Sequence, residues 1–162
     1  MNIKLKRLIT TITVITVLVV TIFVASFHQR QDDDILMEMV LWPGGRGRGS
    51  SIYYFVVRTD GTLTSYFGRS RRSHDNIGTR NFIRSVRERE QIILNESDFA
   101  NISELVDKIV SGETFQRHAM TDLPVKFIHN GNVYVNSTVW PEPLHDLSYM
   151  IFTLSPLAVR GL

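Results

Sequence analysis

The first apolar segment of the chain, residues 8–27, is long and uninterrupted, whereas the later ones are short and are separated by polar or turn residues. It contains no charged residue, Gly or Pro. As an α-helix, its twenty residues would span about 30 Å, the thickness of a hydrocarbon core. Three cations precede it and an acidic triplet follows it: Lys4, Lys6 and Arg7, then Asp32, Asp33 and Asp34. This cation excess predicts a cytoplasmic N-terminus and an exported remainder.

Two interpretations of this run predict different final locations. An uncleaved anchor gives a single-pass protein of the cell membrane with its C-terminal domain outside. A cleaved signal peptide, cut after the small residues of Val24-Ala25-Ser26, gives a secreted protein. Signal-peptide apolar regions are shorter, about 7–15 residues, which favours the anchor. We therefore expect a signal anchor or signal peptide (1–27), a polar linker (28–34) and one exported domain (35–162).

Short runs rich in apolar, aromatic and β-branched residues, bounded by turn residues, predict three strands at the start of the exported domain. Asp60-Gly61 joins two of them and predicts a type I′ hairpin, with positive φ at both residues. This two-residue turn would pair Val57 with Thr64, and Tyr66 would face Phe55. Both faces of the hairpin are largely apolar, so it should lie inside a sheet. The expected strands are Ile35–Trp42, Ile52–Thr59 and Thr62–Phe67.

An ambiguous segment precedes the clearest helix of the chain. Phe82, Ile83 and Val86 fit a helical turn, but the following residues fit a strand that enters the core at Ile92 and Ile93. The helix signal is stronger, with an N-cap and capping box at Asn95 and Asp98 and a stop at Gly112. Its apolar residues recur at spacings of three and four: Phe99, Ile102, Leu105, Val106, Ile109 and Val110.

The last third of the domain repeats this arrangement. Asn130-Gly131 predicts a second type I′ hairpin between strands 123–130 and 132–139, pairing Ile128 with Val133 and Phe127 with Tyr134. Trp140-Pro141-Glu142-Pro143 should end the sheet and begin a helix. The apolar stripe of this helix is Leu144, Leu147, Met150, Ile151 and Leu154. The element order predicts an α+β domain, an antiparallel sheet with two helices packed on one face.

This layout resembles that of small exported bacterial domains of unknown function, many of them lipoproteins or membrane-anchored proteins. The resemblance covers residues 51–155 and rests on the Tyr-rich strand, Asp-Gly, the SDFANISELVDKI helix, and the closing hairpin and helix. It implies a bacterial envelope protein, as does the absence of cysteine from an exported domain. Without a lipid-attachment cysteine, the anchor would be the helix itself. The resemblance implies no functional residues.

The five histidines predict neither a metal site nor a catalytic motif, because none lie at ligand spacing. We expect no cofactor, no metal and no catalytic residue. An alternative interpretation, an enzyme active site, remains at two of the histidines. His74 lies between Ser73 and Asp75, and His145 follows Glu142 by three residues.

Charge is segregated along the exported domain. Residues 46–89 hold ten arginines and three acids, whereas residues 90–162 hold four cations and nine acids. Without the cations ahead of the apolar run the remainder is near neutral, so the basic pI does not indicate nucleic-acid binding. Arginine binds phosphate and carboxylate in bidentate geometry, which makes seven arginines candidates for an anion or partner site. They are Arg69, Arg71, Arg72, Arg80, Arg84, Arg87 and Arg89. The alternative is internal pairing with the acidic helix 96–110.

The sequence therefore predicts a membrane-anchored or secreted, non-enzymatic binding domain. The expected partners are the membrane, through residues 8–27, and an anionic envelope polymer, lipid headgroups or an acidic protein. Nucleic acid is not expected. Two alternatives remain: an envelope enzyme with its site near His74 or His145, and an inhibitor or immunity-type protein with a dedicated protein partner.

Overall fold

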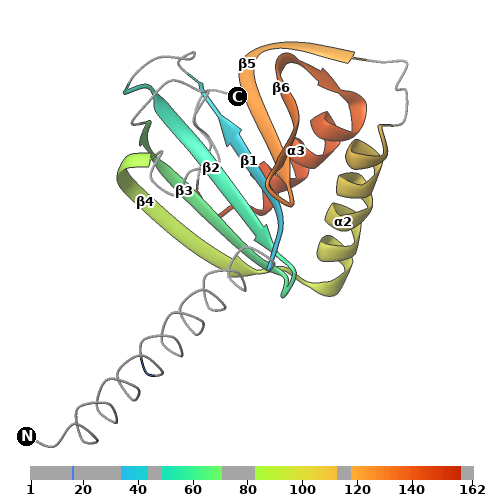
Figure 1. Cartoon of the computed structure of the whole chain (residues 1–162), viewed down its shortest axis with the longest axis horizontal. Helices are drawn as coiled ribbons and strands as arrows, with labels where there is room; N and C mark the ends of the chain where they lie inside the picture. Colours follow the sequence, from blue (N-terminus) through green and yellow to red (C-terminus); the bar gives the residue numbers. More distant parts are fainter. Residues whose placement is uncertain (1–15, 17–33, 44–48, 71–82, 113–117, 158–162) are drawn as a thin grey trace, which may run out of the picture. The chain divides into compact units, whose positions relative to one another are not determined.

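Several strands of residues 35–162 are rich in β-branched and aromatic residues. In the computed structural model, the described strands make one antiparallel sheet in the order β4-β3-β2-β1-β5-β6 (Figure 1). β2 and β3 lie inside it, as their apolar faces predict. The strands are β1 (Ile35–Leu41), β2 (Ser51–Arg58), β3 (Thr62–Ser70), β4 (Ile83–Ile93), β5 (His118–His129) and β6 (Asn132–Pro141).

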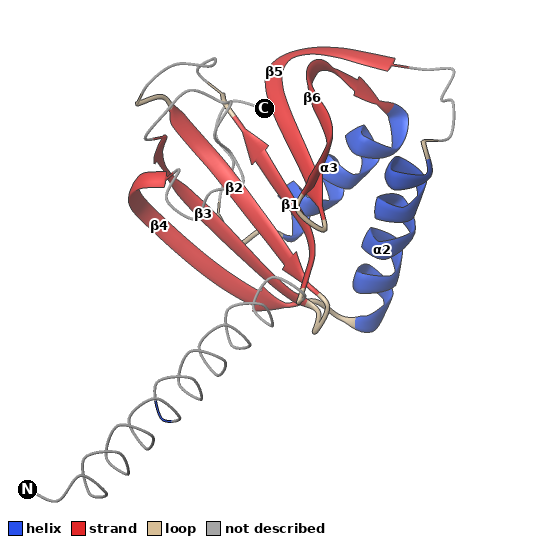
Figure 2. Ribbon diagram, viewed as in Figure 1, coloured by secondary structure: helices blue, strands red, loops and turns tan. Residues whose placement is uncertain are grey.

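Two helices, α2 (Glu96–Ser111) and α3 (Glu142–Leu154), pack on one side of the sheet, which confirms the α+β class (Figure 2). α2 begins where predicted, because the Asn95 side chain accepts a hydrogen bond of 2.8 Å from the Asp98 amide. It ends at Gly112, whose φ of +66° is readily adopted by glycine. Pro143 lies in the first turn of α3, where its missing N–H has no cost.

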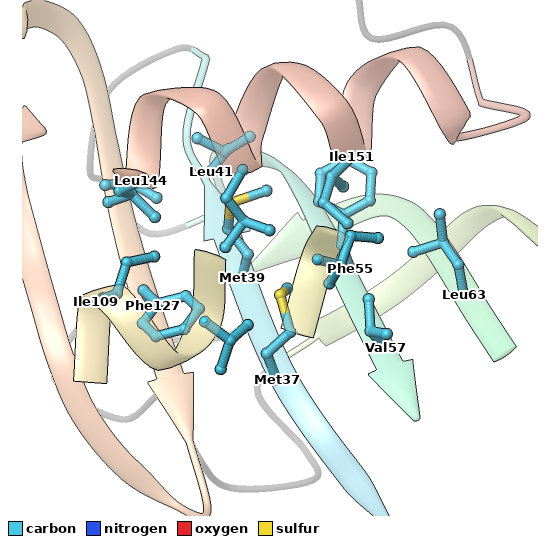
Figure 3. Packing of buried hydrophobic residues seen from close by; sticks show 14 of the residues in the cluster. Met37, Met39, Leu41, Phe55, Val57, Leu63, Ile109, Phe127, Leu144 and Ile151 are labelled. Atoms are coloured by element: carbon cyan, nitrogen blue, oxygen red, sulfur yellow. The ribbon is translucent and has the colours of Figure 1, made fainter. Parts of the chain in front are cut away.

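The side of the sheet that the helices cover is called here the helix face, and the other side the second face. Both predicted apolar stripes point into the core on the helix face. Figure 3 shows Ile109 of α2 and Leu144 and Ile151 of α3 among side chains of the sheet. The sheet contributes, among others, Met37, Met39, Leu41, Phe55, Val57, Leu63 and Phe127.

The first hairpin differs from its prediction by one residue. Only Gly61 has positive φ (+80°), and its amide donates a 3.0 Å hydrogen bond to the Arg58 carbonyl. The loop therefore has three residues, a geometry in which the last one is left-handed. Val57 pairs with Leu63 rather than Thr64. A one-residue shift moves every side chain of a strand to the other face, so the prediction that Tyr66 faces Phe55 is wrong.

The second hairpin has the predicted turn. Asn130 and Gly131 have φ of +48° and +73°, and Ile128 pairs with Val133. The predicted pairing of Phe127 with Tyr134 is wrong. Tyr134 is the extra residue of a bulge, and Phe127 pairs with Val135. The strands are also longer than predicted. β6 continues to Pro141, and Trp140 pairs with Ala119.

The ambiguous segment is strand, not helix, from Ile83 onward. Ile92 packs against the core as predicted, but Ile93 is 81% exposed, because its pairing with Thr62 places it on the second face. Leu94 is buried instead.

The structure describes residue 16 and residues 34–43, 49–70, 83–112 and 118–157. The chain divides into two units, Met1–Asp34 and Ile35–Leu162. In the described part of the chain, no helix has both the length and the apolar character needed to cross a membrane. The predicted anchor lies outside the described residues except for Thr16, which is helical. It therefore stays a prediction.

Candidate functional site

Strand register assembles a row of side chains across the second face. The row runs over five strands, from Lys126 through Val40, Tyr54 and Tyr66 to Arg89. In the neighbouring row, Glu38 of β1 pairs with Val56 of β2, which places it diagonally beside Tyr54. Residues far apart in the sequence thus meet on one surface because adjacent antiparallel strands keep paired residues on the same face.

Direct contacts connect much of this row. The Tyr54 hydroxyl donates a short hydrogen bond to Oε2 of Glu38. The Tyr54 ring stacks on Tyr66, with centroids 5.5 Å apart and planes 27° from parallel. The Arg89 guanidinium carbon lies 5.5 Å from the Tyr66 centroid, within range of a cation–π interaction. The contacts lead from a carboxylate on β1 to a cation on β4.

The row is buried at β5 and β1 and becomes more exposed toward β4. Lys126 is only 5% exposed and Val40 is fully buried, Tyr54 and Tyr66 are partly buried, and Arg89 is exposed. Burial and, next, the negative charge of Glu38 raise the pKa of Tyr54 above its ordinary value of 10.0. The phenol therefore remains a neutral donor at physiological pH. The row is closed to solvent at β5 and accessible at β4.

β4 lies at one edge of the described sheet and is exposed from Ser85 to Gln91. Arg89 pairs with Tyr66 and points to the second face, whereas Glu88 and Glu90 pair with Phe67 and Ser65 of the helix face. Cation and acids are thus separated by face. Two register shifts interrupt the pairing of β4 with β3, and the extra residues are Arg84 and Arg87.

The structure divides the arginines that the sequence predicts as a single site. Arg69 is exposed on β3 and, by strand alternation, shares the helix face with Phe67, opposite to Arg89. Arg87 is exposed at a bulge of β4. Arg84 belongs to β4, but the structure does not describe its side chain. The other three, Arg71, Arg72 and Arg80, lie outside the described residues.

The arginines whose side chains the structure describes do not form ion pairs with the acidic helix. Within the described ranges, no ion pair joins Arg69, Arg87 or Arg89 to an acid; the pairs described are Lys108–Glu104, at 2.6 Å, and His145–Asp146, at 3.7 Å. α2 packs against α3 and near β6, at the other end of the sheet order from β4.

The histidines form no centre in the described residues, where no group of three or more metal-ligating side chains occurs. His145 is exposed near Asp146. His129 has its Nδ1 2.6 Å from the Leu36 carbonyl and its Nε2 2.9 Å from the Asn130 amide nitrogen, so both ring nitrogens have partners. His74 lies outside the described residues.

The row from Lys126 to Arg89 was not predicted from the sequence. The tyrosines of β2 and β3 were evident in the sequence. The predicted two-residue turn, however, placed Tyr54 and Tyr66 on opposite faces of the sheet. Comparisons with family models, with curated proteins and with solved structures find no match to the chain. The site is therefore interpreted from its own geometry.

Proposed function

We propose that this chain is a membrane-anchored bacterial envelope protein whose exported domain acts by binding, not by catalysis. The cationic segment and apolar run at the N-terminus support the location. The observation that supports binding is the β4 edge, an exposed charged strand whose Arg89 is held against Tyr66. Arg87 and Arg89 have no carboxylate partner within the described part of the protein.

The chemistry of the partner follows from these arginines. An unpaired guanidinium favours a carboxylate or phosphate, which it binds through parallel hydrogen bonds. Outside the cytoplasmic membrane, such groups occur on wall polymers, lipid headgroups and acidic proteins. We therefore propose a partner that presents carboxylates or phosphates to β4 and the adjacent part of β3.

Fractionation of cells that express the full-length protein, with mass measurement, tests the location. A full-length product in the membrane fraction is expected for the anchor. A soluble product lacking the apolar run would mean a signal peptide and a secreted domain. A full-length product in the soluble cytoplasmic fraction would contradict export.

Binding is tested with the full-length protein in detergent, using a fluorescent polyphosphate and a fluorescent polyglutamate as probes. Changing Arg69, Arg87 and Arg89 together to Gln should weaken binding of at least one probe by about ten-fold or more, because each exposed cation contributes to anion affinity. Lys108→Gln on α2 is a control for the loss of one exposed cation elsewhere in the domain, and it should leave binding unchanged. Equal affinity in the wild type and the arginine variant would contradict the proposal. Binding should also weaken as salt is raised.

A further inference from the structure

The edge of β4 offers backbone groups as well as charge. A strand at a sheet edge presents the N–H and C=O groups of alternate residues to a further strand. The bulges at Arg84 and Arg87 disturb the first half of β4, so its regular pairing runs from Glu88 to Ile93. These six residues pair regularly with β3 and are exposed or partly exposed, so they form a short template for the addition of a further strand.

The charges on this template constrain what can be added. A strand placed beside β4 keeps each of its residues on the same face as the β4 residue that it pairs with. Glu88 and Glu90 lie on the helix face, and Arg89 lies between them on the second face. A complementary strand therefore has an acid opposite Arg89 and a cation opposite each glutamate.

A second copy of the chain does not meet this condition in antiparallel pairing. The two-fold axis that relates two antiparallel edge strands is perpendicular to the sheet, so it keeps every side chain on its own face. Within Glu88–Ile93, the residue opposite Arg89 would then be Arg89 itself, Gln91 or Ile93, never an acid, and in the first two of these registers a glutamate is opposite a glutamate. Like charges in direct cross-strand positions destabilise the pairing. Parallel pairing of two copies would match the charges, but it is the less stable arrangement per residue.

Arg89 is also positioned before any partner arrives. Its guanidinium carbon lies 5.5 Å from the Tyr66 centroid, and Tyr66 is stacked on Tyr54, which is bonded to Glu38. These contacts restrict the rotamers of a long side chain, so less conformational entropy is lost when it binds.

We propose that β4 from Glu88 to Ile93 binds an extended segment of a partner protein by strand addition, and that this segment alternates cation, acid and cation opposite Glu88, Arg89 and Glu90. The inference rests on the proposed binding function and names its partner class as a protein segment, not a polymer or a membrane.

Two fluorescent peptides of identical composition test the proposal, TVKEKEVT and TVKKEEVT. Only the first separates acids and cations onto different faces of a strand. With the full-length protein in detergent, fluorescence anisotropy should show the alternating peptide binding about ten-fold more tightly. Hydrogen exchange should show new amide protection within Glu88–Ile93. Equal affinities, no binding of either peptide, or protection elsewhere would overturn the proposal.

Matched variants assign the preference to these charges. Changing Glu88, Arg89 and Glu90 together to Gln should make the two peptides bind equally, because the side chains are exposed and only their charges are removed. The control changes the exposed pair Glu104 and Lys108 of α2 to Gln and should keep the ten-fold preference. Concentration-dependent dimerisation that is lost in the triple variant would identify a second copy as the occupant and overturn the proposal. Anion binding without peptide binding would retain the proposed function and reject only this inference.

Discussion

The two faces of the sheet are stabilised by different kinds of interaction, although the same strands contribute to both. On the helix face, fully buried apolar side chains such as Met39, Phe55 and Phe127 pack beneath α2 and α3. On the second face, a smaller apolar cluster around Val40 and Trp42 is accompanied by polar groups. These include Glu38, Tyr54, Thr64 and the buried Lys126.

The difference teaches that one sheet can keep apolar packing on one face and polar contacts on the other. Apolar burial is non-directional and scales with area, so the helix face holds the fold without fixing one pattern of contacts. Buried polar groups need specific partners, so the stability contributed by the second face should depend more on single polar substitutions and on pH. The two tryptophans allow each face to be followed separately, since Trp140 lies in the core of the helix face and Trp42 in the second-face cluster.

The largest effect is expected from a cavity on the helix face. Phe55→Ala should lower the free energy of unfolding by about 3–5 kcal/mol, because the ring is fully buried. Val56→Ala on the second face removes only two carbons and should cost about 1–2 kcal/mol. Denaturant unfolding of the full-length protein in detergent measures both. Equal losses would contradict the assignment of the main core to the helix face.

The next effect comes from the close approach of β3 and β4. A Cβ added at Gly68 would lie 2.3 Å from the Ser85 carbonyl oxygen and 3.2 Å from Cγ2 of Ile83. Gly68→Ala should therefore cost about 1–3 kcal/mol, since backbone must move.

Ile83 packs in the second-face cluster, so Trp42 fluorescence should respond to Gly68→Ala more than Trp140 fluorescence. Gly112→Asn is the control, because nothing lies within 4 Å of its added Cβ and Asn tolerates left-handed backbone. A larger response of Trp140 would contradict the location of the strain.

These contrasts also show which features of the fold the sequence could predict. The capped helix from Asn95 to Gly112 was predicted because its signals are local: one side chain, one amide and one left-handed residue. The turn at Asp60-Gly61 was not, because an Asp-Gly pair fits loops of two or three residues. In the structure, the Gly61 carbonyl accepts a 2.9 Å hydrogen bond from the Leu94 amide, a contact outside the hairpin.

The candidate site depended on that same turn. A one-residue shift of β3 decides whether Tyr66 joins Tyr54 or Phe55, and so whether Arg89 meets an aromatic row. The sequence made these arginines candidates for a binding site without predicting their exposure; in the structure, Arg69, Arg87 and Arg89 are exposed. It could not assign them to faces, because bulges at Arg84 and Arg87 change the alternation of β4.

An effect of similar size is expected from the loss of the hydrogen bond between Tyr54 and Glu38. Tyr54→Phe should cost about 1–3 kcal/mol, because a partly buried carboxylate loses its donor. Glu38→Gln keeps an acceptor and should cost less. The double variant should show coupling of about 1 kcal/mol in a double-mutant cycle. Tyr149→Phe is the control, since Tyr149 is 71% exposed. Additive losses for the two changes would contradict a direct bond.

The smallest effect, per unit of pH, is expected in alkaline solution. The pKa of Tyr54 is raised in the folded protein, mainly by burial and then by Glu38, so the folded state keeps a proton that the unfolded phenol releases near pH 10. The resulting stabilisation is fully present below that pH and is lost as pH rises above it, by about 1.4 kcal/mol per unit. Tyr54→Phe should remove this part of the slope, whereas Tyr149→Phe should not. The absorbance of tyrosinate in the native protein provides an independent measurement, in which Tyr54→Phe should leave the signal near pH 10 unchanged, because the Tyr54 phenol keeps its proton there in the folded state. A smaller tyrosinate signal near pH 10 in Tyr54→Phe than in the wild type would mean that burial does not protect the Tyr54 phenol from ionisation.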